Sequence, residues 1–401
     1  MNTTQITSNN IASEVICNTS KSHANRVLIA CALSREAKVV KNLSDAQDVK
    51  DMLRILSLIG VEIKESADEC IIHNSFPDCE ISSSEPVFID GSEGGTTMRF
   101  LLPLLSLGKN EYHIQLKGSL VSRPMDEILD SLKKLGAYTV KENDLIKIKG
   151  PLRLDKKIKI DCSQTTQFAS ALLLLQIHQP FELEMINLSF SETYIELTKK
   201  VIDEVTHSGE IEISPDFSSL GYFIAYGLTQ QNIHIKNVKE VDSFQADSYF
   251  FKLMDDLKIS YILSENGLLI PKSEYNGFHI DSSLCIDLVP TLIYLACFAK
   301  GPSTFTNLAP LKLKESDRLE EMMNILNSFR MRYEFDRNAL SLKVFPYTNQ
   351  NSIQHPLDLV VADDHRMVMV GTLFLKKFNG GSICPSYAVA KSFPKFFSYF
   401  K

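Results

Sequence analysis

The sequence predicts an α/β protein of two domains, built from six similar units. Three observations support this fold class. The chain has 401 residues, too many for one ordinary hydrophobic core, and its hydrophobic content of 44% is enough to build two. Helical segments that are apolar on all sides alternate six times with amphipathic ones. Five of the amphipathic segments lead into short strand-like stretches, so each unit combines helices with strands.

The apolar segments are expected to form buried helices, because no face of them is suited to water. They span Asn25–Leu33, Thr97–Leu107, Gln167–Gln176, Leu220–Leu228, Leu288–Ala299 and Arg366–Leu375. The amphipathic segments are expected to bury one face. They span Val49–Ile59, Met125–Leu135, Tyr194–Val205, Ser248–Leu257, Leu319–Leu326 and Val389–Phe400. The strand-like stretches begin at Val61, Tyr138, Glu210, Ser260 and Arg332.

The unit recurs about every 55 to 75 residues, which is longer than a solenoid repeat. Three units therefore form each domain. A polar stretch with Ser214-Pro marks the boundary between the third and fourth units. We expect residues 18–216 to form the N-terminal domain, and residues 1–17 and 217–401 to form the C-terminal domain.

Composition and charge exclude several classes of function. The net charge of −7 argues against a nucleic acid or a membrane surface as partner. No apolar run reaches the roughly 18 residues of a membrane span, and no signal peptide is expected. The eight cysteines show no CxxC spacing, so we expect reduced thiols and a cytoplasmic protein. The cluster Asp363-Asp364-His365 is not accompanied by a second group of potential ligands at metal-ligand spacing, so no metal site is expected.

The run from Lys312 to Arg318 holds three cations and two carboxylates directly before an amphipathic helix. Such a run at a helix start combines cations and a proton-transfer group with backbone N–H groups that favour anions. Taken alone, Asp317 and Glu320 could simply cap the helix, with the other charges on a solvated face. This alternative weakens because other polar clusters share the same position.

Unusual polar residues fall at many of the predicted helix starts. They are Thr19 to Ser22 with Arg26, Gly91 to Arg99, Arg123, Thr165 to Gln167, Ser191, Asp287, Asp364 to Arg366, and Lys391. Helix N-termini that converge on a cleft form a strong anion site, because dipoles, N–H groups, hydroxyls and cations add there. Gly94-Gly95 is neither a P-loop nor a GxGxxG motif, but it lets the backbone approach an anion closely. The pattern indicates small substrates that carry phosphate and carboxylate groups.

Six motifs resemble, in order and spacing, those of the 5-enolpyruvylshikimate-3-phosphate (EPSP) synthase family of enolpyruvyl transferases. They are Thr19-Ser-Lys-Ser-His-Ala-Asn-Arg26, Gly95-Thr-Thr-Met-Arg99, Arg123-Pro-Met, Lys314-Glu-Ser-Asp-Arg318, Asp364-His-Arg-Met and Ala390-Lys-Ser-Phe-Pro394. The first and fourth motifs together are highly specific. The resemblance implies a two-domain inside-out α/β barrel, each domain built from three βαβαββ units, which agrees with the alternation of helices described above.

The resemblance also implies a reaction. The enolpyruvyl group of phosphoenolpyruvate would move to the 5-hydroxyl of shikimate 3-phosphate, with release of phosphate. This is a step of the shikimate pathway toward chorismate and the aromatic amino acids. Family members use no metal or organic cofactor and are inhibited by glyphosate at the phosphoenolpyruvate end. We expect a monomer whose partners are the two small-molecule substrates.

Carried over position by position, the resemblance implies three groups of site residues. The residues that bind shikimate 3-phosphate would be Lys21, Ser22, Arg26, Thr165, Thr166, Gln167, Ser191, Tyr194, Asp287 and Lys314. Those that bind phosphoenolpyruvate would be Lys21, Gly95, Arg99, Arg123, Gln167, Arg318, Arg366 and Lys391. The proton transfers would fall to Lys21, Asp287, Lys314 and Glu315, with His365 supporting Glu315. The reaction needs these residue types because two polyanions must be brought together and both a base and an acid are required.

The chain departs from the common family pattern at a few positions. They are Glu93, Phe100, Thr165-Thr166, Ala246 and Pro310. None of these changes removes a charge that the reaction needs, so they bear on affinity and on inhibitor response rather than on reaction type.

Two other functions stay open at this point. A sister transferase that acts on UDP-N-acetylglucosamine would have Lys-Asn where this chain has Lys21-Ser22. A scaffold that only binds an anion would leave Asp287, Lys314 and Glu315 without a purpose. A phosphate-release assay with both substrates would separate these alternatives.

Overall fold

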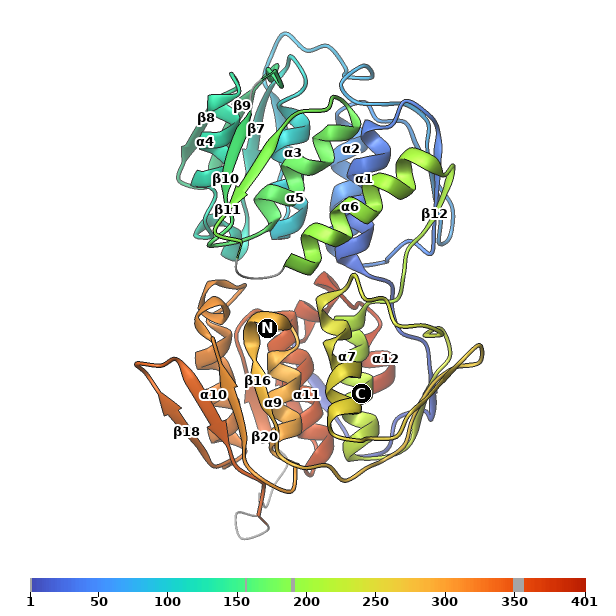
Figure 1. Cartoon of the computed structure of the whole chain (residues 1–401), viewed down its shortest axis with the longest axis vertical. Coiled ribbons are helices and arrows are strands. Elements are labelled where there is room, and N and C mark those ends of the chain that lie inside the picture. Colours follow the sequence, from blue (N-terminus) through green and yellow to red (C-terminus); the bar gives the residue numbers. More distant parts are fainter. Residues whose placement is uncertain (1, 156, 189–191, 349–356) are drawn as a thin grey trace. The chain divides into compact units, whose positions relative to one another are not determined.

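The structure is a computed structural model that describes residues 2–155, 157–188, 192–348 and 357–401. The chain divides into two compact units (Figure 1). One is Thr19–Ser214, called here the N-terminal unit. The other combines the residues up to Asn18 with Pro215–Lys401 and is called the C-terminal unit. None of the helices in the described ranges has the length and apolar character needed to span a bilayer.

The N-terminal unit contains three sheets. The first has the order β12-β3-β5-β4, formed by Glu210–Glu212, Lys38–Lys41, Cys70–Ile72 and Ile63–Glu65. The second has the order β6-β7-β9-β8, formed by Val87–Asp90, Glu111–Gln115, Leu145–Lys149 and Tyr138–Glu142. The third pairs β10 with β11 in parallel, formed by Ile158–Asp161 and Leu183–Ile186. β12, the last strand of the unit in sequence, pairs in parallel with β3, the first strand, and so joins the same sheet.

Three helices form the centre of this unit and contact one another. They are α1 (Lys21–Leu33), α3 (Gly95–Leu105) and α5 (Gln167–Leu174). Nearly all of their residues are buried, as expected for helices that are apolar on all sides. Three further helices bury one face each, and they are α2 (Gln47–Leu58), α4 (Asp126–Lys134) and α6 (Glu192–His207). Short 3₁₀ helices span Gly118–Val121 and Leu175–Ile177.

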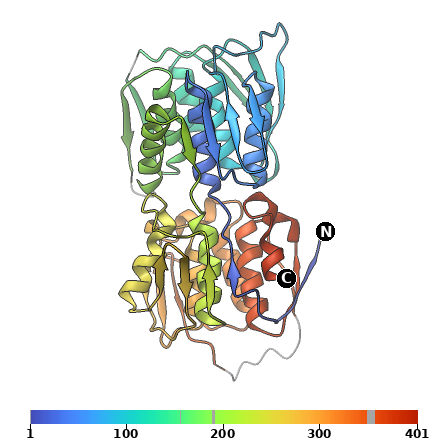
Figure 2. The ribbon, with the colours of Figure 1, turned by 90° about the vertical axis from the view of Figure 1, so that its right-hand side faces the viewer.

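The C-terminal unit has three sheets of the same kind. The first has the order β14-β15-β13-β2, formed by Ile262–Ser264, Gly267–Ile270, Ile233–Ile235 and Glu14–Val15. The second has the order β16-β17-β19-β18, formed by His279–Asp281, Ser303–Thr306, Ser341–Val344 and Tyr333–Asp336. The third has the order β1-β21-β20, formed by Thr4–Ile6, Gly381–Cys384 and Leu357–Val360. Figure 2 shows the blue N-terminal segment, with β1 and β2, among the strands of this unit.

The centre of the C-terminal unit again consists of three buried helices in mutual contact. They are α7 (Phe217–Thr229), α9 (Val289–Ala296) and α11 (His365–Lys377). The remaining helices are α8 (Tyr249–Asp256), α10 (Arg318–Ser328) and the short α12 (Phe396–Phe400). Among the described residues of this unit, 3₁₀ helices span Ala246–Ser248, Ser282–Leu284, Ala309–Leu313 and Ser386–Lys391. Buried helices inside and sheets outside confirm the predicted α/β fold class.

One predicted helix is wrong. The sequence pattern predicted a single amphipathic helix over Val389–Phe400, but a 3₁₀ helix ends at Lys391 and α12 begins only at Phe396. Pro394 lies between the two segments. Proline has no backbone N–H to donate and disfavours a helical conformation at the preceding residue, so a continuous helix cannot form there.

Candidate active site

The N-terminal unit carries the first cationic motif at the start of α1. Ser20 caps this helix, and its hydroxyl accepts a hydrogen bond from the His23 N–H. Lys21 is the first helical residue, and its Nζ lies 2.9 Å from Oδ2 of Asp48, a buried carboxylate in the first turn of α2. Asp48 was not among the residues predicted from the sequence, because one acid in the first turn of a helix is also typical of ordinary helix stabilisation.

Arg26 is completely enclosed on the inner face of α1, with only 2% of its surface exposed. Its polar partners are Oγ1 of Thr198 at 2.9 Å, the carbonyl oxygen of Ser22 at 2.9 Å and Oγ of Ser170 at 3.4 Å. The rings of Phe100 and Tyr194 flank the guanidinium. Burial lowers the pKa of Arg26 to about 10, although Tyr194 opposes the shift. None of these partners is a carboxylate, so a ligand anion would supply the missing counter-charge.

Gln167 begins α5 and links it to α3. Its Oε1 accepts a hydrogen bond from Nη1 of Arg99 at 2.7 Å, and its Nε2 donates to Oγ1 of Thr96 at 3.0 Å. Arg99 also donates from Nη2 to the Pro124 carbonyl at 2.8 Å, so both ends of its guanidinium are fixed. The backbone N–H of Gln167 is bonded to Oγ1 of Thr165 at 3.2 Å, and Thr166 is buried at the N-terminus of α5.

Gly95 begins α3 directly beneath the Arg123 guanidinium. A Cβ atom at position 95 would lie only 2.6 Å from Nη1 of Arg123, closer than atoms normally approach. Glycine therefore lets a cation and the N-terminus of a buried helix share one small space. Ser191, which the resemblance assigned to the same unit, lies outside the described residues.

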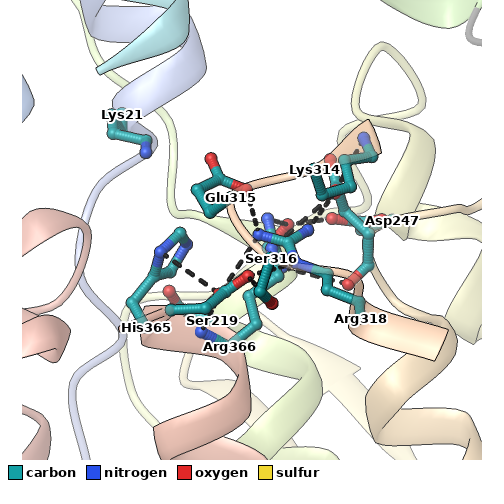
Figure 3. Close-up of polar contacts among 12 residues, drawn as sticks. Lys21, Ser219, Asp247, Lys314, Glu315, Ser316, Arg318, His365 and Arg366 are labelled. Atoms are coloured by element: carbon teal, nitrogen blue, oxygen red, sulfur yellow. Dashed lines mark hydrogen bonds and ion pairs between the residues drawn. The ribbon is translucent and has the colours of Figure 1, made fainter. Parts of the chain in front are cut away.

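The C-terminal unit brings its cations and carboxylates into one network around Arg318 (Figure 3). Nε of Arg318 lies 2.8 Å from Oδ2 of Asp364, Nη1 lies 2.8 Å from Oδ1 of Asp287, and Nη2 donates to Glu315. Arg318 is the first residue of α10, which Asp317 caps by accepting from the Glu320 N–H. Asp317 thus has the capping role that the sequence allowed, while its neighbours build a buried charge network.

Asp287 precedes α9 and receives three cations. Its Oδ1 lies 2.8 Å from Nη1 of Arg318, 3.2 Å from Nζ of Lys314 and 3.7 Å from Nε of Arg366. Burial alone would raise the pKa of Asp287, but Lys314, Arg366 and Arg318 together hold it well below the usual range. The carboxylate therefore stays ionised in this arrangement.

Arg366, in the first turn of α11, is held by groups that the sequence analysis did not single out. Its Nη2 lies 3.0 Å from Oγ of Ser218, and its Nη1 donates to the Asp287 carbonyl at 3.1 Å. Ser218 in turn donates to the buried carboxylate of Asp247. Ser218 is an ordinary polar residue near a helix start, whereas Asp247 follows Ala246, one of the departures from the family pattern, and no role was predicted for it.

The remaining predicted residues of the C-terminal unit are His365 and Lys391. His365 begins α11, and its Nδ1 lies 3.8 Å from Oδ1 of Asp364. Lys391 ends the 3₁₀ helix Ser386–Lys391 and is half-buried. Within the described ranges, no group of three histidine, cysteine or acidic side chains is arranged to hold a metal ion.

Comparison with known proteins places this geometry in a family. The sequence profile described as EPSP synthase (3-phosphoshikimate 1-carboxyvinyltransferase) matches residues 6–207 and 203–400. The 3-phosphoshikimate 1-carboxyvinyltransferase of Aeromonas salmonicida is 26% identical over 425 residues, covering 96% of this chain and 95% of that protein. The Pyrococcus abyssi enzyme of the same description is 27% identical over 398 residues, covering 94% and 92%.

Solved structures share the fold. EPSP synthase from Acinetobacter baumannii superposes with a TM-score of 0.77 at 20% identity, covering 99% of this chain and 97% of that one. The enolpyruvyl transferase NikO from Streptomyces tendae gives a TM-score of 0.74 at 12% identity, covering 99% and 96%. At these identities the structural likeness establishes the fold alone, an inside-out α/β barrel.

Proposed function

The chain belongs to the EPSP synthase family, and on this premise we propose that it transfers the enolpyruvyl group of phosphoenolpyruvate to the 5-hydroxyl of shikimate 3-phosphate. The observation that carries the proposal is the cluster of Lys314, Arg318 and Arg366 on one partly buried carboxylate, Asp287. Such a cluster combines cations that attract anionic substrates with a group that can accept a proton.

The transfer requires three proton movements, two at C3 of phosphoenolpyruvate and one at the hydroxyl of shikimate 3-phosphate, and one exchange of bonds at C2. C3 of phosphoenolpyruvate takes up a proton, the 5-oxygen of shikimate 3-phosphate forms a bond to C2, and the hydroxyl proton leaves. The bond from C2 to the phosphate oxygen then breaks, phosphate departs, and C3 gives up a proton to restore the double bond. We assign the proton at C3 to Glu315 and the hydroxyl proton to Asp287, with Lys21 and Lys314 as the cations that assist.

The charge around Asp287 suggests how it becomes a base. In the structure, Lys314, Arg366 and Arg318 hold its pKa low, so it accepts protons poorly. A substrate phosphate or carboxylate that draws Lys314 or Arg366 toward itself removes part of that charge. The pKa of Asp287 then rises, because burial is no longer opposed by the same cations. Substrate binding itself thus prepares the base.

Residues of helix α1 in the N-terminal unit support shikimate 3-phosphate as the acceptor substrate. Arg26 is a buried guanidinium whose polar partners among the described residues are neutral, and Lys21 stands at the N-terminus of the same helix. Ser22 stands where a UDP-N-acetylglucosamine transferase would have asparagine. Phosphoenolpyruvate is assigned to Gly95, Arg99, Arg123 and Gln167, together with Arg318, Arg366 and Lys391.

The test is a phosphate-release assay with both substrates, with UDP-N-acetylglucosamine as the alternative acceptor. We expect release only with shikimate 3-phosphate, and its absence would overturn the proposal. We further propose a cytoplasmic enzyme, in keeping with eight cysteines that are all free thiols. A monomer remains our prediction, to be measured by light scattering.

A further inference from the structure

Asp247 is a buried carboxylate with no role assigned so far. It lies in the 3₁₀ turn Ala246–Ser248, and only 3% of its surface is exposed. Oδ2 accepts a hydrogen bond from the Ser218 hydroxyl, whereas no donor within the described ranges reaches Oδ1. Burying an acid with so few hydrogen bonds costs folding free energy, so its placement calls for a functional reason.

The Ser218 hydroxyl connects Asp247 to Arg366. Oγ of Ser218 accepts from Nη2 of Arg366 at 3.0 Å while it donates to Asp247. On its other side, the Arg366 guanidinium donates from Nη1 to the Asp287 carbonyl at 3.1 Å. The guanidinium is therefore held between Asp287 and Ser218, and Figure 3 draws Asp247 with this network.

The direction of these hydrogen bonds depends on the charge of Asp247. An ionised carboxylate only accepts, so the Ser218 proton points toward it and the serine lone pairs face Arg366. A protonated carboxyl can donate instead, and it then competes with Arg366 for the same serine oxygen. Ionised Asp247 thus fixes the orientation that serves Arg366.

We propose that Asp247 is a positioning residue for enolpyruvyl transfer, which acts through the Ser218 hydroxyl to hold the Arg366 guanidinium in place for phosphoenolpyruvate. This inference rests on the proposed function, because Arg366 is taken there as a phosphoenolpyruvate ligand. Asp247 acts through two other side chains and has no contact with the reacting atoms in this assignment.

The surroundings of Asp247 place its ionisation near neutral pH. Burial raises the pKa of Asp247 to about 7, with Asp287 and Asp216 acting in the same direction and with Arg366 and the Ser218 hydrogen bond opposing them. Helices α7 and α8 both pack against the turn. The titratable side chains of α7 are the buried Tyr222 and Tyr226, and the charged side chains of α8, all exposed, are Lys252, Asp255 and Asp256. The serine orientation is therefore fixed above pH 7 and loosens below it.

The first test compares wild type with Asp247→Asn, which keeps the size of the side chain and mimics the protonated acid. At pH 8 we expect the KM for phosphoenolpyruvate to rise about tenfold, the scale of one hydrogen bond to a charged group, with kcat within about threefold. At pH 6 the ratio of the two KM values should shrink, because wild-type Asp247 is then protonated as well. Both proteins are compared at each pH, since a phosphate monoester itself titrates near pH 6.

Ser218→Ala breaks the same connection from the other side. We expect it to raise the KM at pH 8 as Asp247→Asn does, and the double variant to be no worse than the more affected single one, because both act on one interaction. Ser218→Thr keeps the hydroxyl and should stay closer to wild type. Asp256→Asn, the same substitution on the exposed end of α8, is the matched control and should change nothing.

The results distinguish failure of the proposed function from failure of the role proposed for Asp247. If wild type releases no phosphate from the two substrates, the proposed function fails and this inference fails with it. If wild type is active while Asp247→Asn and Ser218→Ala both keep its KM at pH 8, the inference alone is overturned. If Asp247→Asn does not fold, Ser218→Ala decides by itself, with a raised KM expected and an unchanged KM contradicting.

Discussion

Nε of Arg318 lies 2.8 Å from Oδ2 of Asp364, and the two side chains are 1% and 0% exposed. Removing the only partner of a buried ion costs about 3 to 5 kcal/mol, and the cost here is smaller because Asp287 and Glu315 still face Arg318. Asp364→Asn should therefore lower the melting temperature and weaken phosphoenolpyruvate binding. Asparagine is also a good N-cap for α11, so the drop in melting temperature reports the lost charge and not a lost helix cap. Asp363→Asn, at the exposed neighbour, is the control, and equal losses in both variants would contradict the prediction.

Glu315→Gln should lower turnover by about 100-fold or more, the usual scale of general acid–base catalysis. The amide keeps the size of the side chain and can still accept from Arg318, but it cannot exchange a proton. Binding of shikimate 3-phosphate, measured by calorimetry, should change little. Solvent deuterium incorporation into the methylene group reports the proton transfer directly.

The control for Glu315 is Glu320→Gln, on the exposed side of α10. If Glu315→Gln kept near-normal deuterium incorporation while Asp287→Asn lost it, the two proton roles would have to be exchanged.

Arg26→Lys should weaken shikimate 3-phosphate binding by about 10 to 100-fold, with little effect on the KM for phosphoenolpyruvate. Lysine keeps the charge but cannot reproduce the planar fork that reaches Thr198, Ser22 and Ser170 together. Calorimetry with shikimate 3-phosphate alone measures the effect. Arg35→Lys, an exposed position just beyond α1, should bind as wild type does, and unaltered affinity in Arg26→Lys would remove Arg26 from the site.

Gly95→Ala should impair glyphosate inhibition more than it impairs phosphoenolpyruvate use. We also expect a smaller effect on substrate binding, because the new methyl group would push aside the Arg123 guanidinium, the flexible end of its side chain. Inhibition constants and KM values, measured side by side, give the two effects. Gly209→Ala is a suitable control, since nothing lies within 4 Å of a Cβ atom there. Equal weakening of inhibitor and substrate would refute the steric explanation.

The melting temperature of Asp247→Asn, relative to that of wild type at the same pH, should be higher at pH 8 than at pH 5. The folded-state pKa of Asp247 is raised to about 7, so the folded chain binds this proton more tightly than the unfolded chain does. The resulting stabilisation is full below about pH 4, the ordinary aspartate range, and is lost as the pH rises to about 7. Melting temperatures at pH 5 and pH 8 test this, with Asp256→Asn as the control. A difference from wild type that does not vary with pH would contradict it.

The helices were predictable from sequence because hydrophobic periodicity depends only on neighbouring residues. Their first turns were not. The apolar pattern begins at Asn25, but α1 begins at Lys21, since the Ser20 cap and the polar first turn resemble a loop in sequence. The break at Pro394 was also overlooked, because the apolar residues on both sides keep a helical spacing.

The cationic half of the site was predictable for a related reason. Lys314 and Arg318 stand out as charges clustered at a helix start, and both belong to one short sequence motif. Asp48 and Asp247 do not stand out, because only tertiary packing brings each of them to its cation or hydroxyl. Residues that act through other residues leave no local pattern in the chain.

Strands β1 and β2 pair with strands that lie much later in the chain. β1 and β2 belong to sheets whose other strands begin at Ile233 or later, whereas the N-terminal unit holds all its strands within its own span. That unit can fold once β12 has emerged, as domains do during synthesis. β2 must wait for β13 and β1 must wait for β21. A growing chain therefore exposes β2 until Ile233–Ile235 has emerged and β1 until Gly381–Cys384 has emerged, and chaperones would have to cover these unpaired strands.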